Sequence, residues 1–182
     1  MSTGLICGDV GIVKQFDGKC LIALTDGLGH GQKAYEAAEL ARGIIDRNYR
    51  EDPVLLMKRL HQELKRTIGG VVAICVMDIE SGKLEHVGIG NITTRVLGKE
   101  PVNIVPKDGV VGYMISSPSK RKVLLSNGDI LLVYSDGIKA QISYEENKQL
   151  FAKSAQKIAE GIITKYGKQK DDNSCLVLKY FK

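Results

Sequence analysis

Aspartates beside apolar, strand-like segments are the residues of this sequence best suited to chemistry. They are Asp9, Asp26, Asp136 and the pair Asp171-Asp172. A carboxylate at the end of a buried strand loses hydration, which costs free energy unless a positive group meets it. No Lys or Arg stands directly beside Asp9, Asp26 or Asp136. If the strand ends converge, the cluster would bind a hard cation, Mg²⁺ or Mn²⁺ rather than Zn²⁺.

Asp-Gly dipeptides also have a simpler interpretation, because this pair is typical of tight turns. A turn suffices for Asp17-Gly18 and Asp108-Gly109, which link short segments. It explains Asp26 and Asp136 less well, since each directly follows an apolar run. From this pattern alone, the metal site and the turn or cap both stay open.

A glycine-rich loop over residues 27–31 follows Asp26 and leads into a predicted helix. Backbone N–H groups at such a helix start can receive phosphate. The glycines equally let the chain turn tightly beside a metal. The loop is not a P-loop, because no Gly-Lys-Ser/Thr follows it.

Hydrophobic periodicity predicts the elements that position these residues. We expect strands over 5–15, 19–25, 71–79, 83–90, 92–97, 122–125, 130–134 and 175–178, and short strands within 101–118. We expect helices over 32–49, from Pro53 to the glycines at 69–70, and over 144–166. Hairpin connections between strands indicate antiparallel sheets and an α+β fold, with the helices outside the sheets.

Composition is that of a single globular domain over residues 1–182. Lys+Arg is 26 and Asp+Glu is 21, which gives a formal net charge of +5. The hydrophobic fraction of 43% excludes a disordered chain. Aromatic residues make up 5% and Trp is absent, which disfavours a stacking platform for nucleic acid. We therefore expect no nucleic-acid partner.

The N-terminal sequence and the cysteines favour the cytoplasm. The N-terminus lacks the basic and long apolar regions of a signal peptide, and no apolar run is long enough for a membrane span. Cys7, Cys20, Cys75 and Cys175 form no C-x-x-C pair, and each lies in or beside an apolar run. We expect four buried, reduced thiols and no membrane association.

Five motifs then occur in an order that resembles a known family. They are Gly8-Asp9, residues 26–31 opening a helix, residues 88–91, residues 127–137 ending in Ser-Asp-Gly, and residues 171–174. Over nearly the whole chain the sequence is similar to the metal-dependent serine/threonine protein phosphatases of the PPM family. The similarity is to the bacterial sporulation and stress-response branch.

The resemblance implies a four-layer α-β-β-α sandwich of two antiparallel sheets flanked by helices. It also implies two Mn²⁺ or Mg²⁺ ions. By motif position, Asp26 bridges both ions, and Asp9 with the Gly27 carbonyl completes one site. Asp136 and an aspartate of the 171–172 pair complete the other; the Asp-x-x-Ser/Thr motif favours Asp171, and Asp172 is the alternative. A hydroxide bound between the ions would attack phosphorus, so Asp26 with this water is the predicted catalytic unit.

The resemblance further implies that the substrates are phosphorylated STAS-domain proteins of a stressosome-like complex. One alternative is a phosphoprotein-binding module that has lost catalysis, which the complete set of acidic positions disfavours. Another is a nucleotide-binding kinase, which the missing phosphate lysine and the antiparallel order disfavour. Eukaryotic members carry a histidine two places after the bridging aspartate, where this sequence has Leu28. We therefore assign no catalytic role to His30.

Overall fold

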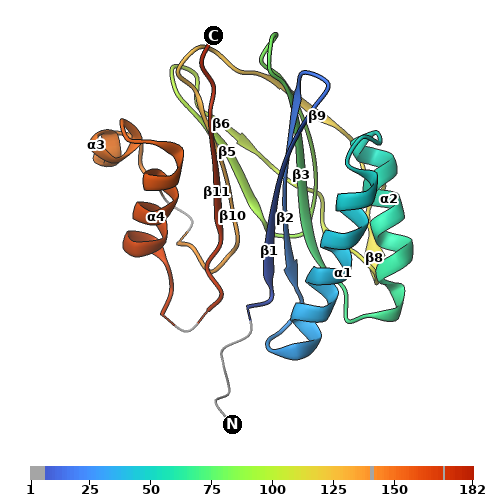
Figure 1. The fold of residues 1–182 in the computed structure, drawn as a ribbon. Helices are drawn as coiled ribbons and strands as arrows, with labels where there is room; N and C mark the ends of the chain where they lie inside the picture. The colour runs from blue at the N-terminus through green and yellow to red at the C-terminus, as the bar shows by residue number, and fades with distance from the viewer. Residues whose placement is uncertain (1–6, 140–141, 170) are drawn as a thin grey trace.

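Two antiparallel sheets lie face to face at the centre of the computed structural model, which describes residues 7–139, 142–169 and 171–182 (Figure 1). The first sheet contains β1 (Asp9–Phe16), β2 (Lys19–Gly27), β3 (Gly70–Asp78), β4 (Lys83–Ile89) and β9 (Arg121–Leu124), in the order β1-β2-β3-β4-β9. The second contains β11 (Cys175–Lys179), β10 (Ile130–Tyr134), β5 (Thr93–Leu97) and β6 (Val102–Ile104), in the order β11-β10-β5-β6. A short hairpin of β7 (Gly109–Val110) and β8 (Met114–Ile115) stands beside the first sheet.

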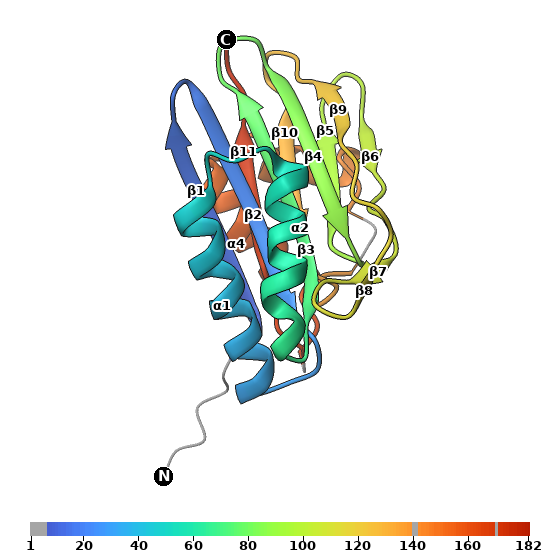
Figure 2. The same ribbon diagram turned by 90° about the vertical axis from the view of Figure 1, so that its right-hand side faces the viewer.

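Helices cover the outer face of each sheet. The first sheet carries α1 (Gln32–Asn48) and α2 (Pro53–Glu63), which lie side by side in Figure 2. The second sheet carries α3 (Lys148–Phe151) and α4 (Ala155–Tyr166), on the opposite side of the molecule (Figure 1). The predicted four-layer α-β-β-α sandwich is therefore confirmed. Within the described part of the chain, no helix has the length and apolar character that crossing a membrane would require.

Three apolar layers hold the sandwich together, and β10 shows why its sequence is uninterruptedly apolar. Leu131 and Val133 point into the core between the two sheets. Ile130 and Leu132 point the other way, into the core beneath α4. Successive side chains of a strand alternate between its two faces, so a strand covered on both sides needs apolar residues throughout.

The turn between β1 and β2 follows directly from its sequence. Asp17 and Gly18 both adopt positive φ, at 45° and 71°. A two-residue hairpin of this type requires positive φ at both central positions, and Asp-Gly supplies it. This turn fixes the β1–β2 register, which places Asp9 opposite Asp26 at the far end of the hairpin.

Two predictions need correction. The helix predicted over 144–166 is interrupted: a 3₁₀ turn (Glu145–Asn147) and α3 precede a separate α4. Ser154 stands at the break, where its hydroxyl accepts a hydrogen bond from the Lys157 amide and caps the start of α4. The cysteines are free, but only Cys20 and Cys75 are buried; Cys175 is half-buried and Cys7 is exposed.

Candidate active site

Asp9 and Asp26 come together because β1 and β2 pair along their whole length. The two residues are direct cross-strand partners, and β3 continues the sheet by pairing Val71 with Asp26. The Gly27 amide donates to the Gly8 carbonyl at 3.0 Å, which extends the pairing by one residue. Gly27 is also pressed against α1, since a Cβ there would lie 2.2 Å from the Ala34 carbonyl oxygen. Only glycine fits at this position.

Asp136 and the 171–172 pair reach the same end of the molecule from the second sheet. β10 and β11 pair antiparallel, and beyond them the Ser135 amide donates to the Ser174 carbonyl at 3.1 Å. The Ser174 amide donates in turn to the Ser135 hydroxyl at 3.1 Å. Asp136 therefore follows β10 at the point where the 171–174 segment enters β11. Both sheets end here, so the aspartates of four strands share one rim.

The rim encloses a cavity of about 280 Å³. Three of the predicted metal-site aspartates line it, Asp26, Asp136 and Asp171, together with Gly27. The other lining residues are Leu28, Gly29, His30, Val71 and Asn91. Asp172 does not line the cavity; its carboxylate accepts a hydrogen bond from the Gly8 amide at 2.6 Å. The structure thus turns Asp171 to the cavity and Asp172 to the start of β1.

Asp9 is a buried carboxylate without a hydrogen-bond partner. Its residue exposure is 8%, and neither carboxylate oxygen has a partner among the described residues. Burial raises its pKa above the usual range, and the neighbouring Asp172 and Asp136 raise it further. The nearby Ser135 and Ser174 hydroxyls lower the pKa in part, although neither is within hydrogen-bonding geometry. An orphaned buried carboxylate needs a cation or a proton, because its desolvation is otherwise uncompensated.

Asp26 has the most strongly perturbed carboxyl group of the cluster. Burial, followed by repulsion from Asp9, Asp136, Asp171 and Asp172, raises its pKa to about 7. Like charges gathered at one site disfavour ionisation of each. A divalent cation would relieve both causes, since its charge compensates for lost hydration and for the repulsion.

The oxygen-only donor set fits Mg²⁺ or Mn²⁺ chemically. Within the described ranges, however, no group of three or more His, Cys, Asp or Glu side chains is arranged to hold a metal ion as it stands. Three carboxylates are engaged elsewhere: Asp136 with the Asn91 amide at 2.9 Å, Asp172 with the Gly8 amide, and Asp171 with the Asp172 amide at 3.1 Å. The side chains would have to turn toward a bound ion.

Asn91 is a site residue to which the sequence analysis gave no role. It follows β4 at the cavity end of the first sheet, and its Nδ2 donates to Asp136 Oδ2 of the second sheet. Ser135 and Ser174, beside Asp9, were missed in the same way. Their position in the sequence could have identified them as site residues. Each stands within one or two residues of a strand end, and that strand end also carries an aspartate or a matched motif. His30 lies at the cavity as a loop residue, as expected.

The comparisons with known proteins agree with this geometry. Residues 17–181 match the family model of Stage II sporulation protein E (SpoIIE), so the chain belongs to the SpoIIE family. Together, the family and the fold define the class: a PP2C-type protein phosphatase. A structure of the PP2C phosphatase domain and a fragment of the regulatory domain of SpoIIE from Bacillus subtilis superposes with a TM-score of 0.76 at 19% identity, over 97% of this chain and 59% of that one.

Within this class the chain is similar to the phosphoserine phosphatase RsbX of Bacillus subtilis. The two are 24% identical over 136 residues, which cover 73% of this chain and 68% of RsbX. A crystal structure of RsbX in complex with magnesium has a TM-score of 0.84 at 19% identity, covering 100% of this chain and 90% of that one. A chain from a structure described as the bacterial stressosome, adapted to control secondary messenger signaling, has a TM-score of 0.88. It is 29% identical and covers 97% of this chain and 93% of that one.

Proposed function

We propose that this protein hydrolyses phosphoserine or phosphothreonine on a signalling protein and depends on divalent cations. One observation carries the proposal. Aspartates from both sheets line a single cavity, and the buried Asp9 carboxylate beside them lacks a partner among the described residues. Acidic side chains at such a density are costly without cations, and perturbed carboxyl groups in a cavity indicate a functional site. Membership of the SpoIIE family supports the same activity.

Each aspartate has a proposed role. Asp9, Asp26 and the Gly27 carbonyl would hold one cation. Asp26, Asp136 and Asp171 would hold a second, with Asp172 as the alternative ligand. When bound, two Mg²⁺ or Mn²⁺ ions supply a water activated as nucleophile and positive charge beside the phosphoryl oxygens.

The remaining residues of the site position these ligands. The Asn91 amide holds Asp136 at 2.9 Å and so limits the directions in which that carboxylate can point. The Gly8 amide holds Asp172 and ties the 171–174 segment to the start of β1. Leu28, Gly29 and His30 line the cavity just before α1 begins.

We further propose that the substrates are phosphorylated STAS-domain proteins of a stressosome-like complex. The similarity to RsbX and to a chain of the stressosome structure supports this choice. We also propose that residues 1–182 act as one phosphatase domain. The cytoplasm stays our prediction for where it acts.

The test is hydrolysis of para-nitrophenyl phosphate with Mn²⁺, with EDTA, and by the Asp26→Asn variant. We expect turnover with Mn²⁺ that EDTA and Asp26→Asn both abolish. Asp17→Asn is the matched control, because Asp17 also precedes a glycine but is exposed and paired with Arg50. It should keep wild-type turnover. Circular dichroism confirms that each variant is folded.

Three other outcomes are informative. Wild-type-like turnover in a folded Asp26→Asn protein would refute the assignment of the site. Absent turnover together with Mn²⁺ binding in calorimetry would indicate a site that acts only on its protein substrate, to be tested on a phosphorylated STAS-domain protein. Absent turnover and absent metal binding would favour the inactive phosphoprotein-binding module.

A further inference from the structure

A groove lies between the free edges of the two sheets, away from the aspartate cavity. β9 is the last strand of the first sheet and β6 is the last strand of the second, and both lie on the same side of the sandwich (Figure 2). No described strand pairs with the outer edge of either one. A hollow of about 260 Å³ lies between them, lined by residues of both strands and by Val105. We call it the edge groove.

The alternation of side chains along each strand shows which residues point into the edge groove. Val102 and Ile104 of β6 face the core between the two sheets, and Val123 of β9 faces the same core. Arg121 lies on the same face of β9 as Val123, because residues two apart in a strand share a face. The groove therefore has apolar walls and carries one cation at its mouth.

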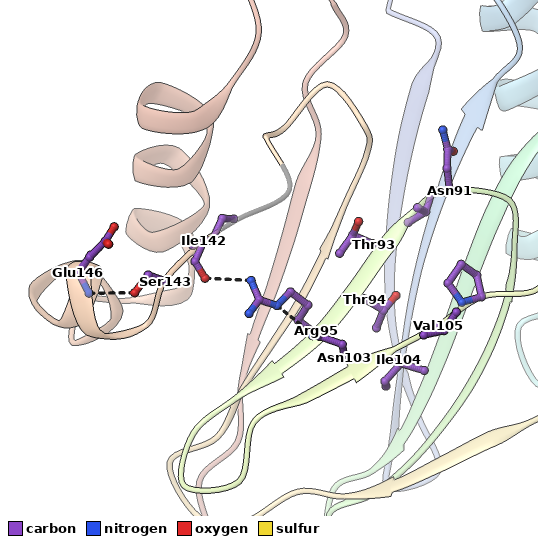
Figure 3. Close-up of a pocket in the computed structure, with 12 residues that line it drawn as sticks. Asn91, Thr93, Thr94, Arg95, Asn103, Ile104, Val105, Ile142, Ser143 and Glu146 are labelled. Atoms are coloured by element: carbon purple, nitrogen blue, oxygen red, sulfur yellow. Dashed lines mark hydrogen bonds between the residues drawn. The ribbon is translucent and has the colours of Figure 1, made fainter.

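Arg121 is an exposed cation whose guanidinium has no partner in the part of the chain that the structure describes. Arg95 offers a contrast, in the separate pocket drawn in Figure 3. Its Nε donates to Asn103 Oδ1 at 2.8 Å and its Nη1 donates to the Ile142 carbonyl at 2.9 Å. Groups of the protein itself thus engage Arg95, whereas the Arg121 guanidinium is free to pair with an acid of another molecule.

The size and position of the edge groove suit a polypeptide. Its volume of about 260 Å³ is below the range of about 300–1,000 Å³ typical of pockets for small molecules, so it fits a few side chains. The β9 edge is accessible, since Arg121 and Lys122 are exposed and Leu124 is 67% exposed. Extended segments commonly bind such an edge as an added strand, held by main-chain hydrogen bonds and selected by alternate side chains.

The sequence of β9 specifies the complementary segment. It reads Arg121-Lys122-Val123-Leu124, two basic residues and then two apolar ones. Opposite charges and apolar pairs across neighbouring strands are stabilising, and like charges are destabilising. An antiparallel partner strand should therefore carry two apolar residues followed by two acidic ones. A second copy fits less well, because centred antiparallel pairing of β9 with itself sets Arg121 opposite Leu124 and Lys122 opposite Val123.

We propose that β9 binds an extended acidic segment of a partner protein, which adds to the first sheet beside β9. Its two acidic residues lie opposite Arg121 and Lys122, and its apolar residues cover the edge groove. β9 pairs with residues 83–86 of β4, whose other end leads to Asn91 at the aspartate cavity. The bound segment thus leaves the aspartate cavity open and tethers the protein to its partner. Such binding does not depend on the proposed phosphatase activity.

The experiment titrates the full-length protein with three synthetic eight-residue peptides and follows its backbone amide signals by NMR. The peptides differ only in their four central residues. These are two valines then two glutamates, two valines then two lysines, or two glutamates then two valines. We expect the first peptide to bind most tightly, because only it pairs both charges and both apolar residues with β9 in the antiparallel direction. The signals that shift should be those of residues 102–105 and 121–124.

Charge exchange at one position provides the sharpest test. Arg121→Gln removes one opposite-charge pair and should weaken binding of the first peptide about 1.4- to 5-fold. Arg121→Glu should weaken it further and should strengthen binding of the lysine peptide. Lys58→Glu is the matched control, since Lys58 is also exposed and its side chain has no partner among the described residues, but it lies on α2. Both peptides should bind this variant as they bind wild type.

Activity and self-association complete the test. A saturating amount of the first peptide should leave hydrolysis of para-nitrophenyl phosphate unchanged. The proposed edge is overturned by absent binding of the first peptide, by equal binding of all three, or by wild-type binding to folded Arg121→Glu protein. A wild-type dimer in sedimentation that Arg121→Glu alters would assign the edge to a second copy instead. Failure of the proposed function is distinct, since it shows as absent Mn²⁺-dependent turnover without peptide.

Discussion

Two regions of this protein place their acidic side chains in contrasting surroundings. On the face formed by α1, α2 and the neighbouring strand ends they are paired with bases. Asp46 lies 3.0 Å from Lys14, and Lys120 lies 2.6 Å from both Asp52 and Glu85. At the opposite region, the rim where both sheets end, Asp9 is buried and lacks a partner among the described residues.

The two regions differ in what they do to a carboxyl group. Lys120 holds the pKa of Asp52 below its usual range. Burial and neighbouring carboxylates raise the pKa of Asp26 to about 7. Exposed pairs contribute little to stability, whereas gathered buried acids oppose it unless cations bind. The rim therefore has the charge arrangement of a cation-binding site, whereas the ion pairs on the face formed by α1 and α2 contribute only a little to stability.

The largest expected difference in activity is between two variants, each of which replaces one aspartate of one region. Asp136→Asn should abolish Mn²⁺-dependent phosphate release, because it removes a proposed metal ligand at the cavity. Asp46→Asn should leave release unchanged, since Asp46 pairs with Lys14 and Arg42 on the surface. Phosphate release from para-nitrophenyl phosphate by both variants measures the difference. Similar activity in the two variants would remove the distinction between the regions.

Asn91→Ala should have a large but incomplete effect. Its amide holds the Asp136 carboxylate, and loss of a group that orients a metal ligand typically costs about 10- to 100-fold in metal affinity or activity. The Mn²⁺ concentration giving half-maximal turnover should rise, and saturating Mn²⁺ should restore part of the rate. A purely structural role would instead lower the melting temperature and leave the Mn²⁺ dependence unchanged.

Metal-free protein should lose stability as pH rises. The ordinary pKa of an aspartate is 3.8 and that of Asp26 in the folded protein is about 7, so between these values the folded state binds more protons. The unfolding free energy attributable to Asp26 therefore falls with rising pH through this window and is lowest above about 7. This contribution is measured by urea unfolding in EDTA from pH 5 to 8, as the difference in unfolding free energy between wild type and Asp26→Asn.

Two controls sharpen the pH experiment. His86 is buried and its pKa is lowered to about 4, so it opposes the trend below its usual value of 6.5. Because both proteins contain His86, its contribution cancels in the difference. Saturating Mn²⁺ should reverse the slope in the wild type, since ligands bind metal in their deprotonated form. If the unfolding free energy changed equally with pH in metal-free wild type and Asp26→Asn, the assignment of the raised pKa to Asp26 would be contradicted.

The smallest effect is expected on the paired face. Lys120→Met removes the ion pairs to Asp52 and Glu85 and should lower the unfolding free energy by no more than about 1 kcal/mol. Turnover and its Mn²⁺ dependence should not change. Urea unfolding with and without 1 M NaCl checks this, because salt screens exposed pairs and should shrink the difference. A larger loss would place Lys120 among the structural supports of the fold.

Much of the fold was predictable from local patterns. The Asp17-Gly18 turn, the two-sided apolar run of β10 and the alanine stripe of α1 are each encoded within about one element, and the structure has them as expected. The break before α4 was harder to predict, because the apolar spacing continues across Ser154. Whether Ser154 caps a helix or stays inside one depends on how α3 and α4 pack on the second sheet.

The candidate site, like the fold, was predictable from the sequence only in part. The sequence by itself determined which residues are aspartates at strand ends, and hence that oxygen ligands for a hard cation could gather. Only the tertiary structure decided that Asp171 lines the cavity while Asp172 bonds to the Gly8 amide, and that Asn91 reaches Asp136. These contacts join residues 45 and 164 positions apart in the chain. They arise from how two sheets face each other, and spacing along one strand does not specify that arrangement.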